Sequence, residues 1–138
     1  MTKKLFIMAL LSILIFSTSY TVTFAANNIP DGINADPVFD SITTTLTTDK
    51  NALFSAYTNG IVGSIKVASC WLQKKVGDSW TYVCPLPAPS VEITNTIGYG
   101  SSMNYSSYIP SDGYTYRIGA RYVADGHHAT RYSNQRSF

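Results

Sequence analysis

The chain has 138 residues, with 10 Lys and Arg, 8 Asp and Glu, and 45% hydrophobic residues. A chain of this length fits one small domain. Its charges are close to balance, which argues against the basic surface of a nucleic-acid-binding protein, and we expect no nucleic acid partner.

The first 25 residues predict a cleaved secretory signal peptide. Lys3 and Lys4 precede an apolar run over 5–16, and small residues follow at positions 25 and 26. An uncleaved membrane anchor is the alternative, but a span needs about 20 apolar residues. We therefore expect a secreted, extracellular protein with no membrane span in its mature chain. Loss of Lys3 and Lys4 takes the basic residues from 10 to 8, which balances the 8 acidic ones.

The mature chain is expected to begin with a flexible lead over 26–40, where two prolines interrupt a segment without periodicity. Alternation of β-branched residues predicts a first strand over 41–48, and 52–58 predicts a second. Asn59-Gly60 is a strong turn signal, so we expect the second strand to end there and a third to start just after it.

The segment 68–84 predicts a β-hairpin on which the other strands pack. A three-residue loop over 76–78 would place Cys70 opposite Cys84. Directly opposed residues have Cβ atoms about 4.5–5.5 Å apart, so a disulfide between Cys70 and Cys84 is expected. Export to an oxidising compartment supports this bond, and two buried free thiols are the alternative. The inner face of this hairpin would hold, with both cysteines, the side chains of Ala68, Leu72, Trp80 and Tyr82.

Beyond the hairpin, three prolines within 85–89 stop the sheet, because proline lacks the donor that a ladder needs. We expect four further strands, the first two separated by a loop at 98–102, over 91–97, 103–109, 114–123 and 127–133. The predicted fold class is all-β: a single immunoglobulin-like antiparallel β-sandwich of about 7–8 strands, occupying 41–138.

Two packed faces of such a sandwich bury one core. The core is predicted from residues at inward-facing positions: Leu46, Phe54, Ala68, Leu72, Trp80, Tyr82, Ile93, Tyr116 and Ile118. A monomer is expected, because nothing in the sequence selects pairing of exposed sheet edges over it.

The segment 110–118, PSDGYTYRI, resembles the entry to strand F of immunoglobulin-like and fibronectin type III-like domains. In those domains a tyrosine hydroxyl caps a nearby backbone group. Tyr116 matches that tyrosine, and Ile118 stands where immunoglobulins carry a cysteine.

A second resemblance rests on WLQKK at 71–75, SWT at 79–81 and GYTYR at 113–117. These motifs are similar to those of a family of small secreted proteins of Gram-positive bacteria that has no assigned activity. The resemblance covers about residues 41–133 and implies a single β-rich domain. Cys70 and Cys84 depart from the family's pattern.

The sequence offers no convincing catalytic or metal-binding pattern. His127 and His128 lie beside Asp125, but neighbouring strand residues point to opposite faces, and a closed zinc site needs about four ligands. No serine lies in a G-x-S-x-G elbow. We therefore expect no metal, no cofactor and no catalytic residues, and a small secreted hydrolase is an alternative function.

The aromatic content is the strongest functional signal. Nine of the ten tyrosines and both tryptophans follow the predicted signal peptide, and such side chains are enriched at binding surfaces. Trp71 is expected on an outer face, and with Arg117 and Arg121 it forms the candidate binding surface. The leading interpretation is a secreted, non-catalytic module that binds an unknown protein or glycan at the cell surface or in the medium. An antagonistic factor of the bacteriocin-like or toxin-like kind is a further alternative.

Overall fold

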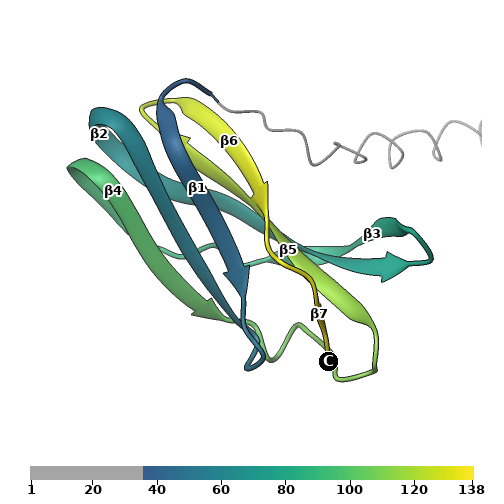
Figure 1. Ribbon diagram of the computed structural model, residues 1–138. Coiled ribbons are helices and arrows are strands. Elements are labelled where there is room, and N and C mark those ends of the chain that lie inside the picture. The colour runs from purple at the N-terminus through teal and green to yellow at the C-terminus, as the bar shows by residue number, and fades with distance from the viewer. Residues whose placement is uncertain (1–35) are drawn as a thin grey trace, which may run out of the picture. The chain divides into compact units, whose positions relative to one another are not determined.

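The computed structural model describes residues 36–138, so the predicted signal peptide and most of the predicted lead lie outside the described residues. The described chain is all-β and antiparallel, which confirms the predicted sandwich-like class (Figure 1). None of its residues lies in a helix long and apolar enough to cross a membrane. Its strands are β1 Phe39–Leu46, β2 Asn51–Val76, β3 Ser79–Leu86, β4 Glu92–Asn104, β5 Thr115–Ala124, β6 His127–Tyr132 and β7 Arg136–Ser137.

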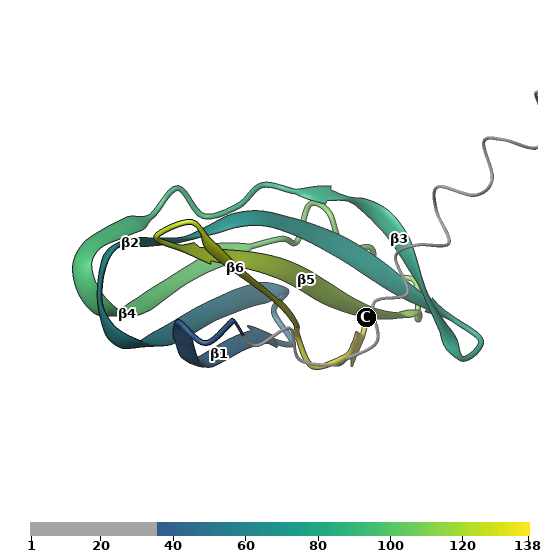
Figure 2. The same ribbon diagram turned by 90° about the horizontal axis from the view of Figure 1, so that it is seen from above.

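Strand β2 connects the two layers of the fold. Its first part pairs with β1 and with the second half of β4, and its last part pairs with β3 and β5. Between them, Val62–Lys66 pairs with the start of β4, so β4 also continues past the corner. One layer is therefore β1–β2–β4, and the other is β3–β2–β5–β6, with β7 paired to the start of β5. Figure 2 shows the long bent path of β2, and the β2–β3 hairpin projects beyond the other strands. Because a single strand of 26 residues serves both layers, all the strands belong to one hydrogen-bonded sheet.

The turn predicted at Asn59-Gly60 is wrong, since β2 continues through it. A type I′ turn needs positive φ at both central residues, and neither of these two residues has it. Instead, Asn59 N donates to Val38 O at 2.9 Å and Thr58 Oγ1 donates to Gly60 O at 2.7 Å. The β2–β4 ladder is irregular at this point. The segment is a corner at which the strand passes from one layer to the other.

The loop predicted at 98–102 is also wrong, because β4 runs without a break from Glu92 to Asn104. The neighbouring β2 supplies ladder partners to this Gly- and Ser-rich stretch, and such tertiary pairing overrides a weak local preference. The strand predicted over 103–109 ends early. Tyr108 N and Ile109 N both donate to Tyr105 O in a turn that follows β4.

The hairpin register differs from the prediction, and the predicted disulfide is wrong. Gly77, with φ of 60°, opens a two-residue turn of the kind that favours glycine at its first central position. A bulge in β3 then pairs Cys84 with Leu72, whereas Cys70 pairs with Leu86. The cysteines are diagonal neighbours, which are about 7–8 Å apart, and both are free thiols. Burial raises the pKa of the Cys70 thiol to about 11.

The core lies between the two layers. Of the predicted core, Ile93 is partly buried, and five residues are fully buried, namely Leu46, Phe54, Leu72, Tyr116 and Ile118. Three predicted members are not in the core: Ala68 and Tyr82 are exposed and Trp80 is partly exposed. A bulge between Val67 and Ser69 turns Ala68 outward, and the shifted hairpin register does the same for the two aromatic residues.

Buried tyrosines tie the core to the polar backbone. The Tyr122 hydroxyl donates to Thr43 O at 2.9 Å and accepts from Thr44 Oγ1 at 2.8 Å, which joins β5 to β1. Tyr116, predicted to cap a backbone group, instead donates its hydroxyl to Asp112 Oδ2 at 2.8 Å. Burial, followed by this bond to a carboxylate, raises the pKa of Tyr116 to about 12.

Candidate binding surface

The outer side of the β3–β2–β5–β6 layer carries a group of neighbouring tryptophan and tyrosine side chains. In the ladders, Gln73 lies opposite both Tyr82 and Arg117, while Gly119 lies opposite both Trp71 and Tyr132. Directly opposed residues point to the same side of a sheet. We call this surface the aromatic face, and its members are Trp71, Gln73, Trp80, Tyr82, Arg117 and Tyr132.

Trp71 lies over the backbone of β5 at Gly119. A Cβ atom on Gly119 would stand 2.2 Å from Cε2 of the indole, so the ring needs a glycine below it. Tyr132 of β6 meets the indole edge to face, with ring centroids 6.0 Å apart and planes at 84°, a favoured aromatic geometry. These two contacts fix Trp71 on the sheet while leaving it partly exposed.

Arg117 organises the centre of the aromatic face. Its guanidinium carbon lies 4.3 Å from the centroid of the Trp80 ring and 4.0 Å from that of Tyr132. Its Nε donates to Gln73 Oε1 at 2.8 Å, and only 8% of the residue is exposed. Cation–π contacts are stronger when desolvated. A buried cation therefore holds two aromatic rings from different strands in place.

The three residues predicted as a binding surface lie on this same side of the sheet, but they differ in exposure. Trp71 is partly exposed, Arg121 is exposed, and Arg117 is buried as a support for its neighbours. Sequence reasoning missed Trp80 and Tyr82, which it had assigned to the core. A two-residue Gly77-Asp78 turn would have revealed them, because it moves both side chains to the outer face.

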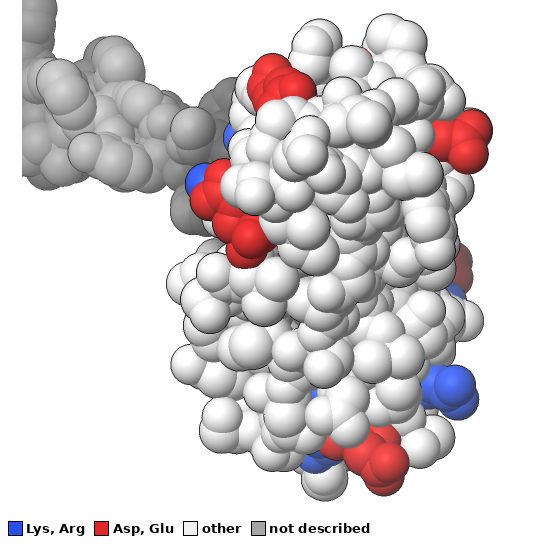
Figure 3. Space-filling view, turned by 90° about the vertical axis from the view of Figure 1, so that its left-hand side faces the viewer, with Lys and Arg blue, Asp and Glu red and all other residues white. Residues whose placement is uncertain are grey.

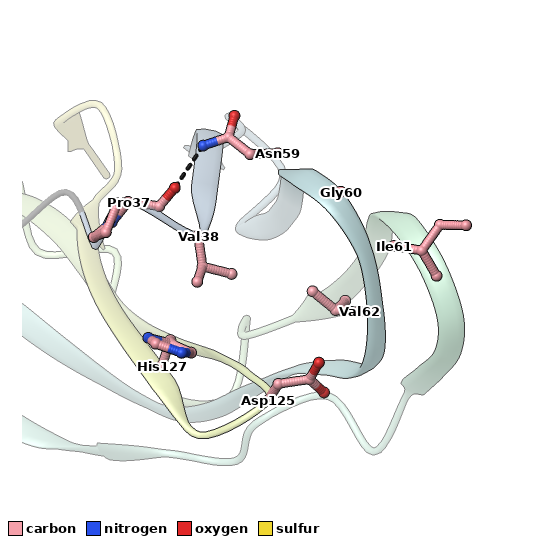
Figure 4. A pocket seen from close by; sticks show the side chains of 8 residues that line it. All are labelled: Pro37, Val38, Asn59, Gly60, Ile61, Val62, Asp125 and His127. Atoms are coloured by element: carbon pink, nitrogen blue, oxygen red, sulfur yellow. Dashed lines mark hydrogen bonds between the residues drawn. The ribbon is translucent and has the colours of Figure 1, made fainter.

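A shallow hollow of about 400 Å³ lies between the start of β1, the β2 corner and the β5–β6 turn (Figure 4). Val38 and Val62 make it largely apolar. Ile61, at 73% exposure, points away from it.

The polar groups at this hollow are engaged in holding segments together. Asp125 accepts from Gly63 N and Ser64 N, each at 2.9 Å, and these bonds hold the pKa of its carboxyl below its usual value. His127 Nδ1 lies 3.0 Å from Asp36 Oδ2. Among residues 36–138 no three His, Cys, Asp or Glu side chains form a group that could hold a metal ion.

Comparisons with protein-family models, with curated proteins and with solved structures found no match for this chain. The resemblances to immunoglobulin-like domains and to small secreted proteins of Gram-positive bacteria therefore stay predictions.

Proposed function

We propose that the protein is an exported, non-catalytic module that binds a glycan through the aromatic face. The observation that carries this proposal is that four neighbouring strands place aromatic, amide and arginine side chains on one outer surface. Aromatic rings offer large contact areas at low conformational cost. A sugar ring has one apolar face that can stack on them and hydroxyls that can bond to nearby polar groups.

The support beneath this surface favours recognition over simple packing. Trp71 rests on Gly119 and Tyr132, and Arg117 is sandwiched between Trp80 and Tyr132. Rings held in place before binding lose little freedom when a ligand arrives, and this raises affinity. Tyr82, at 41% exposure, offers an accessible ring at the rim.

A non-catalytic role agrees with the chemistry of the hollow. Both Asp125 oxygens accept backbone hydrogen bonds, and the nearby imidazole of His127 is paired with Asp36. A hydrolase needs a base within reach of a nucleophile or an activated water. These groups are occupied in structural bonds, so they argue for a scaffold rather than for acid–base catalysis.

The test is retention of the protein, expressed from the full chain, on insoluble cell-wall polysaccharide and on a panel of neutral glycans. Trp71→Ala and Tyr82→Ala are expected to weaken binding at least about tenfold, as anchors of an interface do. Tyr57→Ala is the matched control, because Tyr57 is similarly exposed, at 54%, but lies on the other layer.

Circular dichroism spectra must be the same for all variants, because a variant that fails to fold would also fail to bind. Equal retention of Tyr82→Ala, Trp71→Ala and the unmodified protein would overturn the proposal. So would the absence of binding to every glycan tested.

A further inference from the structure

Two of the edge strands of the sheet are protected against pairing with another chain. In β1, Asn134 donates from Nδ2 to Leu46 O at 3.0 Å and accepts from Leu46 N at 2.8 Å, so its side chain occupies the place of a neighbouring strand. Strand β3 carries Pro85, and Pro87 follows its end. Proline and covered backbone are the usual means by which proteins protect an edge.

At Gly98 the side chain of Thr96 protects the outer edge of β4, because Thr96 Oγ1 donates to Gly98 O at 3.0 Å and accepts from Gly98 N at 3.1 Å. The edge lacks such protection over residues 99–104. This stretch, YGSSMN, contains no proline and no charged residue. Within residues 36–138 its only ladder partner is β2. Among the described residues, no hydrogen bond outside that ladder reaches the backbone of Gly100 or Ser102.

The hydrogen-bond pattern shows which backbone groups point to the open side. Thr47 N donates to Asn51 O, and Tyr105 N donates to Lys50 O. Because bonding directions alternate along a strand, odd-numbered residues of β4 bond to β2 and even-numbered ones point away. The N–H and C=O groups of Gly100 and Ser102 therefore face the open edge.

The side chains that surround this edge carry no charge. The side chains that share the outer side with Gly100 are hydroxyls, Ser55 and Thr43, in the same cross-strand row. Leu53 and Tyr57, at 46% and 54% exposure, border the edge from β2. Figure 3 faces this side of the molecule and shows a broad uncharged area with the charged side chains around its margin.

We propose that two copies of the protein associate by antiparallel pairing of β4 with β4, about a two-fold axis at Ser101. Gly100 of each copy then lies opposite Ser102 of the other, so their outward N–H and C=O groups bond across the axis. The glycine and serine side chains that meet at this contact are small, and neither copy brings a charge to it. We infer that the partner is a second copy of the protein because two identical uncharged edges do not repel each other.

The pairing joins the two β1–β2–β4 layers into one continuous sheet. The strip formed by the two β4 strands is bordered on each side by Leu53 and Tyr57. The aromatic faces, which lie on the other layer, stay accessible in both copies. A dimer would therefore present two glycan sites, although the pairing itself does not depend on the proposed function.

The experiment is sedimentation equilibrium of protein expressed from the full chain, over a concentration series. We expect a monomer–dimer equilibrium for the unmodified protein. Ser102→Lys is expected to weaken it at least about tenfold, because a lysine on an edge strand opposes pairing. Thr43→Lys is the matched control and should dimerise normally, since Thr43 has a similar hydroxyl side chain on the same outer side but lies on β1.

Gly100→Pro provides an independent variant that removes one outward N–H. A Cβ atom at Gly100 meets nothing within 4 Å, and proline is tolerated where the missing donor faces solvent. It should also weaken dimerisation while its thermal unfolding stays cooperative. A monomeric unmodified protein at every concentration would overturn the proposal, as would equal dimerisation of Ser102→Lys. If the protein did not self-associate but bound a different protein through this edge, the proposed dimer would be wrong and that protein would be the partner.

Discussion

Substitution of Gly119 by alanine tests the structure of the aromatic face most directly. The new Cβ atom would lie 2.2–2.5 Å from three atoms of the Trp71 ring, far inside contact distance. The indole must therefore leave its place over β5 and lose its edge-to-face contact with Tyr132. We expect Gly119→Ala to lower both the stability of the fold and the affinity of the aromatic face.

Two opposing effects set the size of the stability change. Overpacking typically costs about 1–3 kcal/mol, whereas replacing glycine reduces the entropy of the unfolded chain and returns about 0.4–1 kcal/mol. The net result is a loss of about 1–2 kcal/mol, which corresponds to a lower urea midpoint by on the order of 1 M. Urea unfolding followed by tryptophan fluorescence reports both the midpoint and the changed surroundings of Trp71.

Gly60→Ala is the control for this experiment. Gly60 is also a strand glycine without positive φ, but a Cβ atom there meets nothing within 4 Å. We expect its unfolding free energy to be unchanged or slightly raised. Equal stability of Gly119→Ala and Gly60→Ala, with an unaltered native emission spectrum, would refute the placement of Trp71 over Gly119.

Three further predictions concern the core, the β5–β6 turn and the thiols. Tyr122→Phe should lower the unfolding free energy by about 1–2 kcal/mol in a denaturant titration, because the hydroxyl bonded to Thr43 O is lost; an unchanged midpoint would contradict this. Two backbone hydrogen bonds hold the folded-state pKa of Asp125 below its usual value, so its stabilisation is present above the unfolded-state pKa and is lost as pH falls through the folded-state pKa. The stability advantage over Asp125→Asn should thus shrink in acid melts, and a difference that stays constant as the pH is lowered would argue against these hydrogen bonds. A thiol reagent at neutral pH should not label buried Cys70 in the folded protein. After unfolding it should label both Cys70 and Cys84. If unfolded protein that has not been reduced shows no reactive thiols, the two cysteines form a disulfide.

Much of the fold could be predicted from local patterns. The alternation of apolar and polar residues over 114–123 identified β5 and placed Tyr116 and Ile118 in the core. The strands predicted over 114–123 and 127–133 left three residues between them, and the structure has a turn there in which Asp125 and Gly126 both have positive φ. These features depend on side-chain periodicity and on turn chemistry, which are local properties.

The candidate site was only partly predictable for a related reason. Trp71, Arg117 and Arg121 were assigned to a surface by strand alternation, and the structure places them on one side of the sheet. Trp80 and Tyr82 were placed on the wrong side, because one residue more or less in a turn or a bulge reverses every side chain after it. No local signal marks the bulge in β3 that follows.

The sequence by itself determined the all-β class, the positions of most strands and part of the core, namely Leu46, Phe54, Leu72, Tyr116 and Ile118. These features follow from period-two alternation, which can be recognised in each segment separately. Only the tertiary structure decided that β2 runs on through Asn59-Gly60, that 98–102 is strand, and that Cys70 and Cys84 stay apart. Each of these outcomes depends on partners distant in the chain. Cross-strand bonds satisfy the backbone wherever a neighbour is available, and they can override the preference of a short segment.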